Sequence, residues 1–186
     1  SMERLDKIIS ATGKKSRREV KILVKQGRIL VDGVPASAPE MKVDPANPQD
    51  PDRDRFVLSK GHAAPVLYAA LANEGYFSTE EIGKLRHLGA MLQGHPDMVG
   101  TPGVDMSSGS LGQGVSVAAG MAKAAKYLER DVRVYALLGD GEIAEGEVWE
   151  ALLFAAHYAL DNLCIVIDIN GLQLDGATKE IMNTDP

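Results

Sequence analysis

The chain has 186 residues, 45% hydrophobic and 25% charged, the composition of an ordinary globular protein with room for one core and a small extra module. No apolar run approaches the roughly 18 residues that a membrane-spanning helix needs, so we expect no membrane partner. The net charge of −6 is unevenly divided, because residues 1–44 hold ten Lys or Arg and six Asp or Glu, whereas residues 45–186 hold ten and twenty. The start of the chain lacks a secretory signal, and the single cysteine, Cys164, excludes an internal disulfide; both features predict a cytoplasmic location.

The first part of the chain predicts a small α+β module over residues 1–40. RLDKIISATG places its apolar residues on one helical face, and Ser16 is positioned to cap a second helix that ends at Gly27. RILVDGVPA then predicts a short strand with a turn at Asp32-Gly33. The proline-rich, non-periodic segment that follows predicts a linker over residues 41–55.

Residues 56–186 predict a different architecture. VRVYALL and LCIVIDI are continuous apolar runs, joined by the helical pattern AEGEVWEALLFAAHYAL. Strands without alternation, connected by a helix, are typical of a parallel sheet with helices on both faces. We therefore expect an α/β fold in which these two strands are parallel neighbours. Cys164 is expected in the core, and Trp149 in core or interface packing.

Two polar positions follow these strands. Gly139-Asp140-Gly141 comes directly after the first strand, and Asn170 comes at the end of the second. Because ligands of parallel sheets bind beyond the carboxyl ends of the strands, Asp140 and Asn170 are expected to converge there. Their hard oxygens suit Mg²⁺ or Ca²⁺ bridging to a phosphate. A lone GDG would otherwise be read as an ordinary turn.

Other candidates lie in loops. His62 and His95 occur in segments with glycine and proline, where a histidine can shuttle protons or donate to phosphate and sugar oxygens, although each alone also fits a surface residue. SSGSLGQG places several N–H groups at a helix start, which favours an anion. His87 and His157 are expected to have no role in the site.

The spacing from GDG to Asn170 resembles the thiamine diphosphate signature, and several further segments resemble transketolase in particular, most closely the amino-terminal subunit of split bacterial enzymes. Those segments are SKGHAAP, LQGHPDM, TPGVDMSSGSLGQG, EGEVWEA, DNL and NGLQLDG, within residues 41–186. The resemblance implies that thiamine diphosphate and Mg²⁺ (or Ca²⁺) are the cofactors. It implies a metal site made by Asp140, Asn170 and the carbonyl of Leu172, and cofactor contacts from Leu111, Gly112, Gly139, Asp140, Gly141 and Asn170.

The same resemblance implies roles in catalysis and assembly. His62 and His95 would line the diphosphate and substrate channel, and Glu145 and Glu150 would belong to a proton network between the active sites of a homo-oligomer. The family's histidine-bearing glycine loop has no counterpart before residue 41, and its later strands and pyrimidine-binding domain are not matched. We therefore expect a truncated thiamine-diphosphate-binding fold that is catalytically incomplete without a pyrimidine-binding subunit or domain.

Residues 3–44 resemble a different family, the small RNA-binding alpha-L module of bacterial ribosomal pseudouridine synthases. The resemblance implies phosphate contacts from basic residues between positions 4 and 28, namely Arg4, Lys7, Lys14, Lys15, Arg17, Arg18, Lys21, Lys25 and Arg28. The alternative for this segment is a solvated basic helix. Three hypotheses follow for the chain: a transketolase-type fragment, a chimera with an RNA-binding front and a non-catalytic α/β part, or a structural protein with neither activity.

Overall fold

The computed structural model describes residues 3–11, 15–31, 34–39, 42–43, 50 and 52–183. The chain divides into two compact parts, unit 1 (Ser1–Asp52) and unit 2 (Arg53–Pro186). Each unit has a hydrophobic core made of its own residues. Among the described residues, no helix is both long and apolar enough to cross a membrane.

Unit 1 is a small α+β module. Its elements are β1 (Glu3–Arg4), α1 (Leu5–Ala11), α2 (Arg17–Lys25), β2 (Leu30–Val31), β3 (Val34–Pro35) and β4 (Lys42–Val43). Strands β1 and β4 pair antiparallel, as do β2 and β3. The segment 41–55, predicted as a linker, contains strand residues at both ends. Near its start β4 pairs with β1, and at its end Arg55 begins the first strand of unit 2. The turn predicted at Asp32-Gly33 lies outside the described residues.

Helix α2 begins where the sequence predicts. The Ser16 side chain accepts a hydrogen bond from the Glu19 backbone N–H at 3.3 Å, and the Glu19 carboxylate accepts one from the Ser16 N–H at 2.8 Å. This reciprocal capping box satisfies two N–H groups that a helix start would leave free, and it lowers the pKa of Glu19. Val20 and Val24 are buried on the inner face, while the basic side chains on the outer face are exposed.

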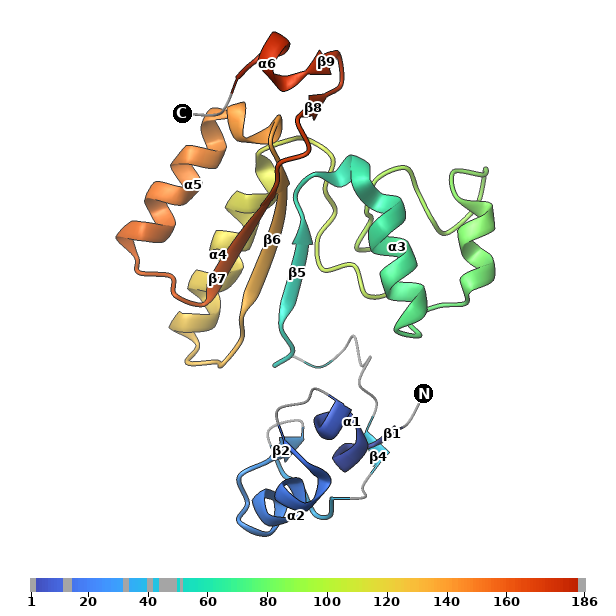
Figure 1. Cartoon of the computed structure of the whole chain (residues 1–186), viewed down its shortest axis with the longest axis vertical. Helices are drawn as coiled ribbons and strands as arrows, with labels where there is room; N and C mark the ends of the chain where they lie inside the picture. Colours follow the sequence, from blue (N-terminus) through green and yellow to red (C-terminus); the bar gives the residue numbers. More distant parts are fainter. Residues whose placement is uncertain are drawn as a thin grey trace. The chain divides into compact units, whose positions relative to one another are not determined.

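Unit 2 is built on a three-stranded parallel sheet in the order β5-β6-β7 (Figure 1). Its strands and helices are β5 (Arg55–Leu58), α3 (Ala64–Asn73), α4 (Gln113–Tyr127), β6 (Val134–Gly139), α5 (Gly146–His157), β7 (Leu163–Asp168), β8 (Leu172–Gln173), β9 (Gly176–Ala177) and α6 (Thr178–Ile181), with 3-10 turns η1 (Gly61–Ala63), η2 (Thr79–Lys84) and η3 (Glu142–Ala144). The pairing of β6 with β7 confirms the predicted parallel neighbours, and α5 joins them.

Helices cover both faces of this sheet. On one face, α4 and α5 pack on alternate residues of β6, including Val134, Ala136 and Leu138. On the other face, α3 packs against Leu58 and Leu137. The alanines of α4 let its backbone approach the sheet closely, since their side chains occupy little space. The α/β architecture expected from the apolar runs is therefore confirmed.

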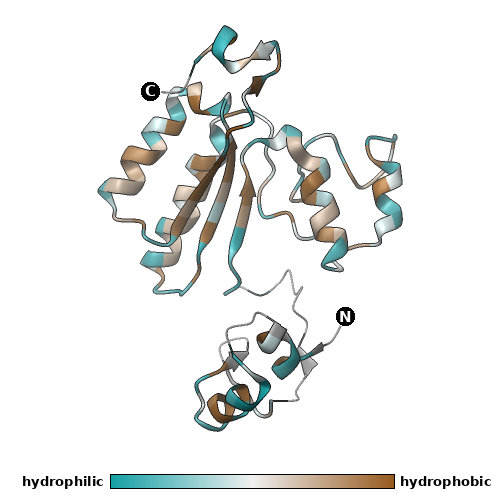
Figure 2. Cartoon of the chain, in the orientation of Figure 1, coloured by the Kyte–Doolittle hydropathy of each residue, from teal (hydrophilic) through white to brown (hydrophobic). Residues whose placement is uncertain are grey.

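Strand β7 is less covered than its sequence predicts. Figure 2 shows that the strand is hydrophobic along its length, yet Val166 is 49% exposed and Cys164 is also exposed. The expectation that Cys164 packs in the core is wrong for this chain. The physical reason is that β7 pairs only with β6, so its outer edge and part of one face meet no further element of the described chain.

Candidate functional site

A pocket of about 690 Å³ lies at the carboxyl ends of β6 and β7. Figure 1 shows β8, β9 and α6 beyond this end of the sheet. The pocket is lined by Lys60, His62, Gly109, Leu111, Gly139, Asp140, Gly141, Glu142, Ala144, Glu145, Asn170, Leu172, Gln173, Leu174 and Asp175. Many of the site residues predicted from the sequence thus line one cavity, although their positions span more than half of the chain.

Asp140 ties the ends of two strands together. Its backbone N–H donates to the carbonyl of Asp168 at 3.1 Å, which continues the ladder between β6 and β7. Its carboxylate accepts hydrogen bonds from the N–H groups of Gly141, at 2.8 Å, and Gly171, at 2.7 Å. Asp140 is only 3% exposed as a residue, and its side chain is held beside Gly171, the residue that follows Asn170.

The turn after β7 positions the other two predicted metal ligands. The Asn170 side-chain oxygen accepts from the Leu172 N–H at 2.9 Å, and its amide group donates to Asp168 at 3.4 Å. Gly171 has a φ of 75°, a left-handed conformation that glycine adopts without a steric penalty. Asp140, Asn170 and Leu172 thus line one pocket.

The donor set at this position fits a hard cation. One carboxylate, one amide oxygen and one main-chain carbonyl are oxygen ligands of the kind that Mg²⁺ and Ca²⁺ prefer. Among the described residues, no group of three or more His, Cys, Asp or Glu side chains could hold a metal ion. With three protein oxygens, a cation bound here would take its remaining ligands from a phosphate or from water, which is how Mg²⁺ is commonly held.

Two glycines of the site cannot be replaced without a steric conflict. A Cβ on Gly141 would lie 2.9 Å from the Cγ of Gln173. Gly112, the N-cap of α4, has a φ of 83°, and a Cβ on it would lie 2.9 Å from the Cβ of Glu145. Gly112 is buried and does not line the cavity, whereas Leu111 does. The loop before α4 and the turn after β6 are thus packed closely together.

Of the two loop histidines, only one lines the pocket. His62 is exposed and lines the pocket from η1. His95 does not line it, but its ring lies 3.3 Å from the position of a Cβ on Gly109, which does. The backbone of the His95 loop is fixed by Tyr68, whose hydroxyl donates to the carbonyls of Gln93 at 3.0 Å and His95 at 2.8 Å.

The two predicted glutamates lie at different places on unit 2. Glu145 is the N-cap of α5 and lines the pocket. Glu150, further along α5, lines a shallow groove between α4 and α5 together with Ser116, Glu147 and Phe154. The structure therefore places Glu145 at the cavity and Glu150 on an outer helical surface.

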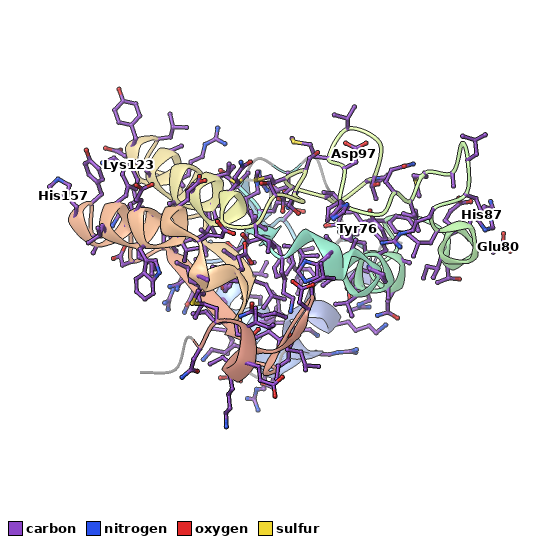
Figure 3. All side chains as sticks on the ribbon, turned by 90° about the horizontal axis from the view of Figure 1, so that it is seen from above. Tyr76, Glu80, His87, Asp97, Lys123 and His157 are labelled. Atoms are coloured by element: carbon purple, nitrogen blue, oxygen red, sulfur yellow. The ribbon has the colours of Figure 1, made fainter. Side chains whose placement is uncertain are left out.

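Neither of the remaining histidines lines the pocket. Figure 3 shows His87, near Glu80, and His157, near Lys123, at opposite ends of unit 2. His157 packs edge-on against Tyr158, with ring centroids 4.8 Å apart. These positions agree with the expectation that neither residue belongs to the site.

Lys60 and Glu142 are pocket residues that sequence reasoning missed. The Lys60 side chain is 8% exposed, and its Nζ lies 2.8 Å from Asp168, whose pKa is lowered mainly by this hydrogen bond. Lys60 follows the end of β5 closely, and in a parallel sheet that position alone indicates nearness to the ligand edge. Lys60 thus places a buried cationic group at the pocket, where it is paired with Asp168.

Comparisons with known proteins show to which family the chain belongs. Residues 38–186 match the family model "Transketolase, thiamine diphosphate binding domain", and residues 3–47 match the S4 domain model. The chain is 51% identical over 146 residues to the 6-deoxy-6-sulfo-D-fructose transketolase subunit of a Clostridium species, covering 78% of this chain and 53% of that protein. It is 50% identical over 133 residues to human transketolase, covering 71% of this chain and 21% of that protein.

A solved structure gives the same answer for the fold. Transketolase from Leishmania mexicana superposes with a TM-score of 0.70 at 38% identity, covering 75% of this chain and 23% of that one. The chain thus spans about half the length of the bacterial subunit and about a fifth of the human enzyme that it matches. Residues 3–47 are thus similar to the S4 domain, and the chain belongs to the transketolase thiamine diphosphate binding domain family.

Proposed function

We propose that unit 2 is the diphosphate-binding part of a transketolase-type transferase, in which a pyrimidine-binding domain or subunit completes the active site. The observation that carries this proposal is the single pocket that brings Asp140, Asn170 and Leu172 together with Lys60 and His62. The family to which the chain belongs supports the identity of the ligand. The bacterial subunit that it resembles supports a division of the enzyme between two chains.

Each residue has a distinct role in this proposal. Asp140, Asn170 and the carbonyl of Leu172 would hold Mg²⁺, or Ca²⁺, against the diphosphate. Lys60 would add positive charge at the pocket wall, and His62 would donate to an oxygen of the cofactor or the sugar. Thiamine diphosphate, when bound, supplies the electron sink that allows a two-carbon ketol unit to move between sugar phosphates.

The metal-binding role of Asp140 can be tested by replacing it with asparagine. Asp140→Asn keeps the size of the side chain but removes the only negative charge of the ligand set, so Mg²⁺-dependent affinity for thiamine diphosphate should fall by about two orders of magnitude or more. Calorimetric titration measures this, with Asp131→Asn, an exposed carboxylate outside the pocket, as the control. Equal affinity in the Asp140 variant would place the ion elsewhere, and no binding by the parent chain would refute a functional pocket.

We also propose that these 186 residues do not transfer a ketol unit on their own. The pocket can position a diphosphate, but the carbon that reacts lies in the thiazolium ring, and its deprotonation would need the aminopyrimidine ring held and activated by a pyrimidine-binding domain. Activity should therefore require the pyrimidine-binding subunit of a split transketolase. Turnover of sugar phosphates by the purified chain alone would contradict the proposal.

RNA binding by unit 1 is a second candidate function. The observation that favours it is the exposed basic face of α2, with Arg17, Arg18, Lys21 and Lys25, within a match to the S4 domain. Reversing the charges of Arg17 and Arg18 should weaken binding to a structured RNA and make the salt dependence shallower by about one unit for each lost phosphate contact. Binding that is indifferent to both salt and mutation would exclude an electrostatic interface.

The same measurements separate the remaining hypotheses. The matches to the two family models overlap at residues 38–47, and we propose that two parts of independent origin join there. A chimera with a non-catalytic α/β part should bind RNA but not thiamine diphosphate. A purely structural protein should bind neither ligand.

A further inference from the structure

Glu142 is a buried carboxylate that forms no ion pair within residues 52–183. It lies in η3, is 2% exposed, and is held by neutral donors. One carboxylate oxygen accepts from the Gly112 N–H at 3.0 Å and from the Ser59 hydroxyl, and the other accepts from the Gly139 N–H at 3.1 Å. Burying a carboxylate is costly unless its oxygens are hydrogen-bonded, so the three donors must stay in place for the charge to be tolerated.

The three donors come from separate segments that surround the pocket. Ser59 follows β5, Gly112 is the N-cap of α4, and Gly139 is the last residue of β6. The chain neighbours of these donors, Lys60 and Leu111 among them, line the pocket. One side chain therefore fixes the relative positions of three segments that form the pocket walls.

We propose that Glu142 is a positioning residue for the diphosphate site. This inference rests on the proposed function of unit 2. Both carboxylate oxygens already accept hydrogen bonds from the chain, and a negative charge would repel a diphosphate in direct contact. Glu142 therefore acts through the loop before α4 and the turn after β6, whose spacing it sets.

Two substitutions each remove part of the hydrogen bonding around the Glu142 carboxylate. Glu142→Gln has nearly the same size but turns an NH₂ group toward one of the donors, so at least one N–H loses its acceptor. Ser59→Ala removes one donor and leaves the carboxylate with the two backbone N–H groups. Glu74→Gln, an exposed glutamate at the end of α3, is the matched control.

Titration with thiamine diphosphate and Mg²⁺ tests the proposal, at a temperature where thermal unfolding shows every variant to be folded. Affinity should fall about tenfold in Glu142→Gln and roughly threefold in Ser59→Ala, and should not change in Glu74→Gln. Parent-like affinity in a folded Glu142→Gln overturns the positioning role. Absence of binding by the parent chain instead counts against the proposed function.

A second measurement needs no ligand. Hydrogen exchange of the Gly112 and Gly139 amides, followed by NMR, should be about tenfold faster in Glu142→Gln than in the parent. The Asp140 amide, which donates to the Asp168 carbonyl, should exchange at an unchanged rate. If Glu142→Gln does not fold, faster exchange of Gly112 in Ser59→Ala supports the inference, and unchanged exchange overturns it.

Discussion

Tyr68 is a completely buried phenol whose hydroxyl group donates to two carbonyls in the loop that carries His95. Tyr68→Phe removes the hydroxyl that both carbonyls share as a donor, so we expect the free energy of unfolding to fall by about 1–2 kcal/mol. Chemical denaturation of the parent and variant measures this difference. An unchanged unfolding free energy would mean that the loop is held by other contacts.

The same residue predicts a dependence of stability on alkaline pH. Burial raises the pKa of Tyr68 above 10.0, and the nearby charge of Asp97 raises it further. Because the folded state keeps the phenol neutral, the contribution of Tyr68 to stability is fully present below the ordinary tyrosine pKa and is lost as the pH rises past it. The stability of the parent should therefore decline more steeply at alkaline pH than that of Tyr68→Phe, as unfolding at a series of pH values would show.

At the scale of residues, the sequence predicted the pocket residues that directly follow strands. It missed a residue whose contacts come from distant segments of the chain. Asp140 and Asn170 could be anticipated because each follows a buried strand, and parallel strands bring such positions together. Glu142 could not, because a glutamate in a sequence resembles any surface charge. Its three donors come from positions 59, 112 and 139, and only the folded chain brings them together.

Helix α4 contains two glycines, one tightly packed against the chain and one in open space. A Cβ on Gly114 would lie 2.6 Å from the Cα of Ser59, whereas a Cβ on Gly120 would meet nothing within 4 Å. Gly114→Ala should therefore destabilise unit 2 by about 1–3 kcal/mol, because the helix must move away from the end of β5. Gly120→Ala should stabilise it by about 0.5–1 kcal/mol through the higher helix propensity of alanine.

Thermal unfolding of both variants, with circular dichroism to confirm helix content, compares them directly. The two substitutions change the same helix by the same methyl group, so propensity alone predicts equal gains. A stabilised Gly114→Ala would show that the close contact between α4 and β5 is absent in solution.

At the scale of elements, the parallel pair β6 and β7 and the helix between them were predicted correctly, because long apolar runs fix the element type. The exposure of β7 was not predicted. Apolar character indicates a strand that suits burial, but the sequence of a single strand does not say whether a neighbour is present to cover it. The pairing of β4 with β1 was likewise hidden in a segment whose prolines favour a linker.

At the scale of the whole molecule, α5 exposes large apolar side chains to solvent. Trp149 is 56% exposed and Leu153 is 72% exposed, although the Trp149 ring N–H donates to the Ile143 carbonyl at 2.9 Å. Clusters of this kind favour association, and we propose that the chain forms at least a dimer through this helix. Leu153→Glu should shift the sedimentation coefficient to that of a monomer, while Leu88→Glu, at a fully exposed position in unit 2, should leave it unchanged. A monomeric parent at high concentration would contradict the proposal.

The exposed side of β7 also carries a position where a spectroscopic label can be attached. Cys164 is the one cysteine of the 186-residue chain, and its thiol is exposed on that strand. Any thiol-directed dye or spin label would therefore attach at a single known place, on the strand that leads to Asn170. Its fluorescence or mobility would report directly on whether a complementing subunit docks along the sheet, independently of any assay for turnover.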